Sequence, residues 1–223
     1  MVTDLPFWEQ PEHVERFAAR EPDHRLIEIL DGLESPSEVR VLDLGCAGGR
    51  NAVLLADHGC SVWGLDASQA MVEKTRGRLA SLIGEEMAAR RVVEGSMSEL
   101  GRYEDGFFHL VVALGIYHNA ASRTEWERAL SESARVLAPG GLLLVAAFTP
   151  ETDLTGAGVL PVAGEPLVYE GFPSGRALLV TAEKLDAALE TRGLLPVVPS
   201  ETVITPTDTG RRVTINALYR KRG

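Results

Sequence analysis

The chain has 223 residues, 45% of them hydrophobic and 24% charged, a balance typical of one soluble globular domain. Its net charge of −10 argues against nucleic acid as a partner, because a duplex-binding surface needs clustered cations. No apolar run approaches the roughly 18 residues of a membrane span, and the first residues show no signal peptide. We therefore expect a cytoplasmic protein with no membrane association.

The cysteines and histidines give no indication of a disulfide framework or a metal site. Cys46 and Cys60 are too few for such a framework. The five histidines show no metal-ligand spacing with one another or with a cysteine, so we expect no metal. The sequence carries no signal for a particular oligomeric state.

Residues 1–36 predict two short helices that form an N-terminal cap. Pro11 suits the first turn of a helix over residues 12–21. Asp23 precedes a second apolar segment and is a favourable helix N-cap, and Gly32 ends that helix.

Residues 37–148 alternate between short apolar strands and longer amphipathic helices. Ser68 is the predicted cap of one long helix, and Ser122 with Glu125 forms a capping box at the start of another. The predicted strands cover residues 39–44, 60–65, 91–94, 107–114 and 142–148. This alternation predicts an α/β fold with a parallel sheet and helices on both faces.

The alternation ends after Phe148. Residues 149–180 are rich in Gly and Pro and too long for a plain connection, so we expect an insertion that forms an ordered loop or a small lid on the acceptor side. Residues 181–223 predict one helix and a terminal antiparallel hairpin. We therefore predict a single domain with a cap, a cofactor-binding core at 37–148, the insertion and the C-terminal part.

A glycine-rich turn after the first predicted strand is the most informative motif. It reads Gly45-Cys46-Ala47-Gly48-Gly49, and its glycines permit a tight turn and close approach of a ligand. Asp66 ends the next strand, 21 residues after Gly45, where its carboxylate can accept both hydroxyls of a ribose. The turn and the aspartate together predict a nucleoside site at the switch point of a doubly wound sheet.

The turn resembles motif I of the class I S-adenosylmethionine-dependent methyltransferases, in which an acid (here Asp43) and an apolar residue precede a glycine-rich turn. Residues 66–71, 95–97, 114–118 and 135–141 resemble further motifs of that family in the same order. The resemblance implies a Rossmann-like, seven-stranded, mostly parallel sheet of order 3-2-1-4-5-7-6 with strand seven antiparallel. It implies a methyltransferase of the small-molecule branch, with S-adenosyl-L-methionine as cofactor.

The resemblance also implies which residues bind the cofactor. Asp43 and the turn from Gly45 to Gly48 would face its methionine portion, and Asp66 would hold the ribose hydroxyls. Positions expected around the adenine or beneath the cofactor are Ala67, Met71, Gly95, Ser96, Met97, Leu114 and Gly115. Ser96 and His109 depart from the family pattern, which usually has an aspartate at each. We expect Ser96 or a backbone carbonyl to meet the adenine amine, and His109 to be a substitution at the level of the fold.

Methyl transfer from a sulfonium is an in-line displacement that depends mainly on alignment and exclusion of water. His118, just past the fourth strand, is the candidate general base for an alcohol or phenol. The alternative is a histidine that packs against the cofactor or forms a hydrogen bond with a loop. The segment 115–118 lacks the Pro-Pro-Tyr type tetrapeptide of families that methylate adenine or glutamine amides, which favours a small-molecule acceptor. Asn119 alone is not enough for a metal-assisted catechol site.

Two segments are predicted to enclose the acceptor. Near the N-terminus these are Phe7, Trp8 and His13, and His13 shares a helix face with Phe17 and Arg20. The alternative for that face is a plain capping helix with Phe17 in the core. Residues expected to line the other side of the acceptor pocket are Tyr117, Tyr169, Phe172 and Arg176.

Two other functions are compatible with the same motifs. A protein that binds S-adenosylmethionine without methylating anything, as a sensor or partner subunit, would keep Asp43, Gly45 and Asp66. An NAD(P)-dependent oxidoreductase is disfavoured, because the glycine spacing does not follow G-x-G-x-x-G.

Overall fold

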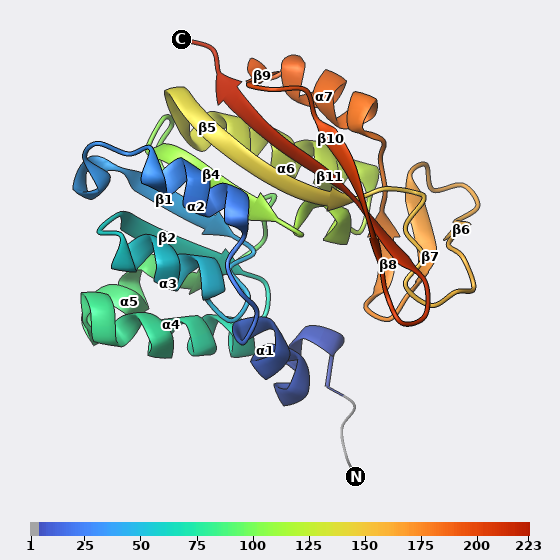
Figure 1. Cartoon of the computed structure of the whole chain (residues 1–223), viewed down its shortest axis with the longest axis horizontal. Helices are drawn as coiled ribbons and strands as arrows, with labels where there is room; N and C mark the ends of the chain where they lie inside the picture. Colours follow the sequence, from blue (N-terminus) through green and yellow to red (C-terminus); the bar gives the residue numbers. More distant parts are fainter. Residues whose placement is uncertain (1–4) are drawn as a thin grey trace. The chain divides into compact units, whose positions relative to one another are not determined.

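In a computed structural model that describes residues 5–223, the main sheet has eight strands (Figure 1). Seven of them follow the hydrogen-bonded order β10-β11-β5-β4-β1-β2-β3, and β9 pairs with β11. Strands β1 to β4 pair in parallel where they meet, and β11 runs antiparallel to β5 and β10. Counting β10 and β11 as strands six and seven gives the predicted order 3-2-1-4-5-7-6, which is therefore confirmed. Residues 1–4, the start of the predicted cap, lie outside the described residues.

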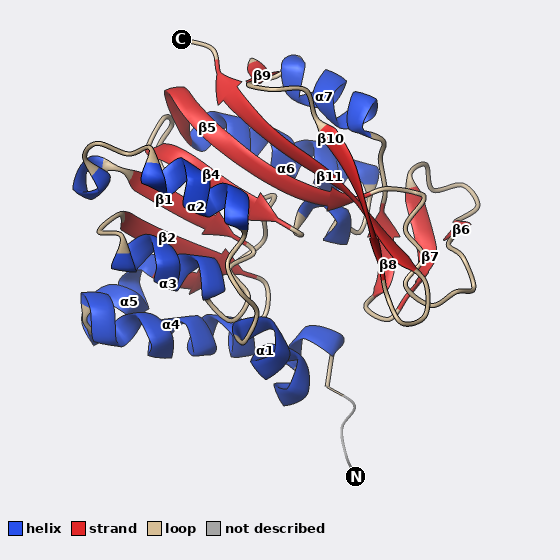
Figure 2. Ribbon diagram, viewed as in Figure 1, coloured by secondary structure: helices blue, strands red, loops and turns tan. Residues whose placement is uncertain are grey.

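The chain divides into two compact units, and unit 1 consists of residues 1–97 and 108–112. Its strands are β1 (Arg40–Leu44), β2 (Ser61–Asp66), β3 (Val92–Glu94) and most of β4 (Phe108–Leu114). Its helices are α1 (Pro11–Ala18), α2 (His24–Asp31), α3 (Arg50–Asp57), α4 (Gln69–Ile83) and α5 (Glu85–Arg91), with 3-10 turns η1 (Phe7–Glu9) and η2 (Pro36–Glu38). Figure 2 shows α3, α4 and α5 gathered beside β1 and β2.

The sequence explains the elements of unit 1 well. Asp23 and Ser68 accept hydrogen bonds from the first turns of α2 and α4, as their positions before apolar periodic segments predict. Val41, Leu42 and Leu44 of β1 have no exposed surface, as expected for a parallel strand that is covered on both faces.

Unit 2 consists of residues 98–107 and 113–223 and follows on from β4. Its elements are η3 (Tyr117–Asn119), α6 (Arg123–Val136), β5 (Leu137–Phe148), β6 (Leu160–Pro161), β7 (Val168–Phe172), β8 (Gly175–Leu178), α7 (Ala182–Glu190), β9 (Leu194–Pro196), β10 (Glu201–Pro206) and β11 (Arg211–Lys221). Helix α6 packs on β5. Half of the predicted capping box is confirmed, because Ser122 Oγ accepts from the Glu125 N–H. The Glu125 carboxylate accepts from the Ala121 N–H at 2.7 Å, one residue before the N-cap Ser122.

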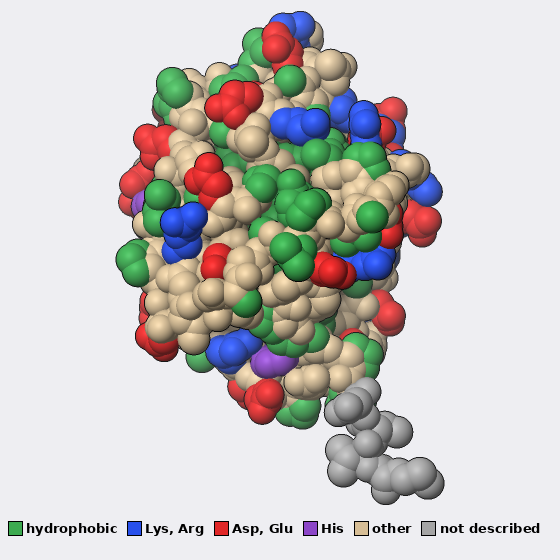
Figure 3. Space-filling model, turned by 90° about the vertical axis from the view of Figure 1, so that its right-hand side faces the viewer, with side chains coloured by type: hydrophobic (Ala, Val, Ile, Leu, Met, Phe, Trp, Pro, Cys, Tyr) green, Lys and Arg blue, Asp and Glu red, His purple; other side chains and the backbone are tan. Residues whose placement is uncertain are grey.

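The insertion after β5 has more regular structure than a loop. Strands β6, β7 and β8 form an antiparallel sheet of their own, and Phe172, Ala177 and Leu179 form a small buried core beneath it. Leu160 of β6 and Ile204 of β10 stay exposed in this unit. Figure 3 shows one face of the molecule, on which hydrophobic side chains gather between charged ones.

Three boundaries differ from the sequence prediction. Gly84, at φ +84°, separates α4 from the unpredicted α5, whose sequence EEMAARR has no strong apolar period. Strand β5 begins at Leu137 rather than after the Pro139-Gly140-Gly141 turn, and β9 adds an eighth strand by pairing with the end of β11. Strand β9 is short and the start of β5 contains two glycines, so the pairing of both depends on the rest of the sheet.

Candidate functional site

The glycine-rich turn between β1 and α3 has a left-handed backbone at three positions. Gly45 and Gly49 have φ of +76° and +80°, and Ala47 has φ of +47°, a conformation that a residue with a Cβ rarely adopts. The Ala47 N–H donates to Asp66 Oδ2 at 2.8 Å, and the Ala47 carbonyl accepts from Thr75 Oγ1 at 2.6 Å. Hydrogen bonds from the Ala47 N–H and to the Ala47 carbonyl therefore hold the turn in place.

Asp66 organises the end of β2. Its Oδ2 accepts from Ala47 and its Oδ1 accepts from the Ser68 N–H at 3.0 Å. Its backbone carbonyl accepts from the Gly95 N–H at 2.9 Å, which brings the loop after β3 to the same edge. Burial raises the pKa of Asp66, although the hydrogen bonds from Ser68 and Ala47 act to lower it.

Asp43 lies at the end of β1 with 1% of its surface exposed. Its Oδ2 atom is buried and has no hydrogen-bond partner among the described residues. The pKa of Asp43 is raised to about 7, mainly by burial; the nearby Arg50 charge acts to lower it and the Asp66 charge acts to raise it. An unpartnered carboxylate oxygen of this kind suits a cation, and S-adenosylmethionine carries both an ammonium and a sulfonium. The residues of unit 1 thus fit that cofactor.

The C-terminal end of α1 packs directly on the glycine-rich turn. A Cβ built on Gly48 would lie 2.5 Å from the Cβ of Ala18, so only glycine permits this approach. Arg78 of α4 donates from Nη1 to the carbonyls of both Ala18 and Gly48, at 2.9 and 2.8 Å. The sequence interpretation assigned Gly48 to close approach of a ligand, whereas here the space beside its Cα is filled by Ala18.

The segment before α1 caps the start of α4. Ser68 Oγ donates to the Trp8 carbonyl at 3.0 Å, and the Glu9 carboxylate accepts from the Ala70 N–H at 3.2 Å. These hydrogen bonds hold η1 against Ser68 and Ala70, which follow Asp66 in the chain by two and four residues. The N-terminal segment therefore covers the start of α4, directly after Asp66 in the chain.

The predicted aromatic residues of the N-terminal segment contact one another. The Phe7 ring lies 4.7 Å from that of Trp8 and 3.7 Å from that of His13, between ring centroids. Trp8 also contacts Phe17 at 5.2 Å, and the Arg20 guanidinium lies 4.1 Å from the centre of the Phe17 ring. These residues form one partly buried cluster on η1 and α1.

The other predicted cofactor positions differ in exposure. Ala67 is exposed and Gly95 and Ser96 are partly buried, whereas Met71 and Met97 are 1% and 6% exposed. Cys46 is buried, and burial raises the pKa of its thiol. In unit 2, Leu114 is partly buried, and Gly115, at φ +86°, donates to the Ala146 carbonyl at 2.8 Å.

Unit 2 carries the other predicted acceptor residues, on η3, β7 and β8. His118 of η3 stacks on Phe148 at the end of β5, with ring centroids 4.2 Å apart, and Phe148 stacks on Phe172 of β7 at 5.9 Å. Tyr117 has no exposed surface and donates from its hydroxyl to Ser133 Oγ of α6 at 2.7 Å. Tyr117 thus positions η3 from the core side.

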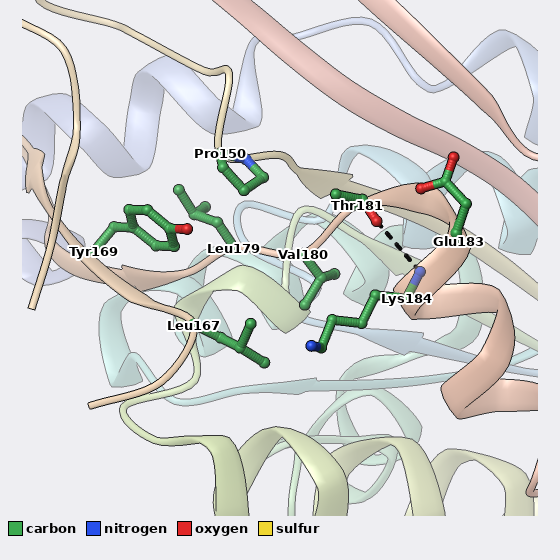
Figure 4. Close-up of a pocket in the computed structure, with 8 residues that line it drawn as sticks. All are labelled: Pro150, Leu167, Tyr169, Leu179, Val180, Thr181, Glu183 and Lys184. Carbon is green, nitrogen blue, oxygen red and sulfur yellow. Dashed lines mark hydrogen bonds between the residues drawn. The ribbon is translucent and has the colours of Figure 1, made fainter. Parts of the chain in front are cut away.

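The remaining two predicted residues lie on the insertion sheet. Arg176 of β8 is exposed and pairs with Glu165 at 2.7 Å. Tyr169 lines an open cavity of about 470 Å³ beside the start of α7, and Lys184 runs from that helix toward Leu167 (Figure 4). The cavity is lined by Pro150, Leu167, Tyr169, Leu179, Val180, Thr181, Glu183 and Lys184, none of which belongs to the glycine-rich turn.

Sequence reasoning missed the residues that hold the N-terminal segment in place. Arg78 and Ser68 act through backbone carbonyls of Ala18, Gly48 and Trp8, and no sequence motif marks such partners. No sequence motif predicts the stack of His118 on Phe148 either, because the two residues come from different elements.

The described residues show no metal site and no membrane span. Among residues 5–223, no three His, Cys, Asp or Glu side chains lie where they can share a metal ion. No helix in the same range is long and apolar enough to cross a membrane.

A doubly wound sheet with a glycine-rich turn after β1 and an aspartate at the end of β2 defines a Rossmann-like nucleoside-binding protein. Residues 41–141 match a family model described as a methyltransferase domain. A ubiquinone biosynthesis O-methyltransferase from Brucella anthropi is 30% identical over 159 residues, which are 70% of this chain and 60% of that protein. The chain thus spans about 60% of the length of this curated relative.

Two solved structures share the fold. One is a protein from Pyrococcus horikoshii OT3, with a TM-score of 0.67, 20% identity, and coverage of 97% of this chain and 94% of that one. The other is the Burkholderia thailandensis 1,6-didemethyltoxoflavin-N1-methyltransferase with bound 1,6-didemethyltoxoflavin and S-adenosylhomocysteine, with a TM-score of 0.61, 17% identity, and coverage of 100% and 93%. Residues 41–141 are thus similar to a methyltransferase domain, and the whole chain shares the fold of these two structures.

Proposed function

We propose that the protein transfers a methyl group from S-adenosylmethionine to an oxygen or nitrogen of a small molecule, with the chain acting as a single methyltransferase domain. The observation that carries this proposal is Asp66, whose carboxylate joins the glycine-rich turn to the start of α4. When bound, the cofactor supplies a methyl group on a sulfonium, whose carbon–sulfur bond breaks with the electron pair left on sulfur as the acceptor atom bonds to the methyl carbon.

The residues of unit 1 would bind and orient the cofactor. Each oxygen of Asp66 keeps a lone pair beyond its bond to Ala47 or Ser68, which suits the two hydroxyls of a ribose. Asp43 would pair its buried oxygen with a cationic group of the cofactor. The residues after β3, Gly95 to Met97, would lie beside the adenine, because the Gly95 N–H donates a hydrogen bond to the Asp66 carbonyl.

The relatives and the aromatic side chains of unit 2 support a particular kind of acceptor. The Brucella relative is named for an O-methylation, which favours an oxygen acceptor. The stack of His118, Phe148 and Phe172 supports a flat ring as its partner, because aromatic rings pack well on one another. A hydroxylated aromatic ring combines both properties. The acidic net charge of the chain supports a small molecule rather than nucleic acid.

The experiment is an assay of methyl transfer from radiolabelled S-adenosylmethionine to catechol and 4-nitrocatechol, with calorimetric binding of S-adenosylhomocysteine in parallel. Binding together with a labelled product supports the proposal, and Asp66→Ala should reduce both. Binding without transfer to these or to a fractionated cell extract would indicate a sensor or partner subunit. Binding of NAD in place of either adenosyl ligand would overturn the assignment.

A further inference from the structure

The His118 ring is held by the backbone of the strand on which it stacks. The Phe148 N–H donates to His118 Nδ1 at 3.2 Å, and the two rings lie at 19° to each other. His118 is 8% exposed. The ring therefore has a fixed position at the end of β5, and one of its two nitrogens is already in use.

The identity of that partner determines where the imidazole proton lies. A backbone N–H can only donate, so Nδ1 must be an acceptor without a proton, and a neutral ring then carries its hydrogen on Nε2. Among residues 5–223, Nε2 has no hydrogen-bond partner. His118 is thus a buried ring with one unused donor.

Among the described residues of unit 2, the charged side chains on the elements packed against η3 are engaged with other partners; on α6, Arg128 pairs with Glu99 and Glu132 pairs with Arg135. The elements packed against η3 are β5, α6 and β8. Strand β5 has no charged side chain, Arg176 of β8 pairs with Glu165, and the Glu125 carboxylate of α6 caps Ala121. The first residue of α6, Arg123, pairs with Glu127. Burial alone lowers the pKa of His118, to about 4.

We infer that His118 donates a hydrogen bond from Nε2 to an oxygen of the methyl-accepting molecule and does not act as its base. This inference rests on the proposed function. The ligand class is a hydroxylated aromatic ring whose hydroxyl is acidic enough to lose its proton to water before transfer. The oxygen of that phenolate then forms the bond to the methyl carbon, while Nε2–H orients the ring through the same or the neighbouring oxygen. The imidazole gains and loses no proton in this step.

The first test does not require turnover. Long-range proton–nitrogen NMR spectra of the ¹⁵N-labelled full chain, with the His118 signals assigned through His118→Gln, should show a neutral ring with its hydrogen on Nε2 at pH 7. Adding 4-nitrocatechol to the complex with S-adenosylhomocysteine should shift the Nε2 signal. A ring protonated on Nδ1, an imidazolium at pH 7, or no shift at saturating 4-nitrocatechol would each overturn the inference.

The second test separates a donor from a base. Gln places an amide donor near the position of Nε2 but is no base, whereas Leu offers neither. We expect His118→Gln to keep kcat/KM for 4-nitrocatechol within a few-fold of wild type, and His118→Leu to lose about 10- to 100-fold. A base would make both variants lose about 10²- to 10⁴-fold. His24→Gln, at an exposed histidine of α2, is the matched control.

The pH profile adds a third readout. If the phenolate forms without His118, the midpoint of kcat/KM should follow the pKa of the acceptor, so 4-nitrocatechol should reach its plateau at a lower pH than catechol. His118→Gln should leave both midpoints in place. A midpoint shared by the two acceptors and abolished by His118→Gln would overturn the inference. Failure of methyl transfer with normal S-adenosylhomocysteine binding would instead contradict the proposed function, and the NMR result would still stand.

Discussion

Ala18 occupies the space where a side chain at Gly48 would lie. A Cβ on Gly48 would be 2.5 Å from the Ala18 Cβ and 2.7 Å from its Cα. The Arg78 guanidinium donates to the carbonyls of both residues, so α1 is joined to the glycine-rich turn by packing and by hydrogen bonds. The N-terminal segment and the turn therefore form one structural assembly within unit 1.

Replacing Gly48 with Ala should displace α1 from the turn. The added methyl group cannot be accommodated beside the backbone of Ala18, and overpacking of this kind costs about 1–3 kcal/mol. We expect a lower melting temperature and faster proteolytic cleavage within residues 11–23. Both are measurable on the full chain.

Gly77→Ala is the matched control for this substitution. Gly77 lies within α4, and a Cβ there meets no atom within 4 Å. Alanine should stabilise the helix by about 0.5–1 kcal/mol. If Gly48→Ala were as stable as Gly77→Ala, the close approach of Ala18 would not hold α1 in place.

The sequence predicted the parallel core because its local signals agree with its tertiary structure. Each strand of unit 1 is a short apolar run, and Asp23, Ser68 and Ser122 cap helices where their positions require. The insertion was predicted only as a segment, because its strands pair with each other and carry no strong alternation. The single domain and the site residues remain predictions.

The sequence could place Asp43 and Asp66 at strand ends but not their partners. Asp66 binds two backbone N–H groups, and Asp43 leaves an oxygen unpaired, both of which depend on how the chain folds around them. His109 shows the same limit. The sequence predicts a substitution at the level of the fold there, and the structure shows its Nδ1 accepting from the Arg40 N–H at 3.1 Å across the β1–β4 pair. Which backbone group a side chain meets is a tertiary property.

Deleting residues 1–10 should impair cofactor retention more than overall stability. The deletion removes the Trp8 and Glu9 contacts with the start of α4, next to Asp66, while the strands of unit 1 keep their pairing. We expect weaker binding of S-adenosylhomocysteine and reduced turnover with a small change in melting temperature. A truncated protein with full affinity and activity would show that this segment only packs on the surface.

Stability should depend on His118 in acid. Burial lowers the pKa of its imidazole from 6.5 to about 4, so the unfolded chain takes up the proton first as the pH falls. The contribution of the neutral ring is present above pH 6.5 and is lost as the pH falls toward 4. Wild type should therefore lose free energy of unfolding relative to His118→Gln across that range, in urea titrations at fixed pH. Parallel curves for the two proteins would contradict the lowered pKa.

Asp66→Ala should weaken the binding of S-adenosylhomocysteine by about 1–3 kcal/mol. This is the range expected when a charge-assisted hydrogen-bond partner is lost. The variant also releases Ala47 from the hydrogen bond that supports its left-handed backbone. Asp66→Asn is the closer comparison, because it keeps the shape of the side chain and one acceptor oxygen. Calorimetry should rank wild type above Asn and Asn above Ala. Equal affinities would remove Asp66 from the ribose site.

The pKa of Asp43 predicts how pH affects the free and the bound protein in opposite ways. Its folded-state value of about 7 lies above the ordinary 3.8, so the unfolded chain loses this proton first as the pH rises. The stability linked to the protonated carboxyl is present below pH 4 and is lost as the pH rises to 7. Without ligand, wild type should lose free energy of unfolding relative to Asp43→Asn over that window.

A cationic cofactor should reverse this behaviour. If the buried Oδ2 pairs with the ammonium or sulfonium, the bound form needs the carboxylate, so affinity should rise between pH 5 and 7 and binding should release a proton near pH 6. Calorimetry in two buffers with different ionisation enthalpies measures that proton directly. Asp43→Asn should bind S-adenosylmethionine more weakly and release no proton. Wild-type binding without proton release, at an affinity equal to that of Asp43→Asn, would mean that Asp43 stays neutral in the complex and serves the fold alone.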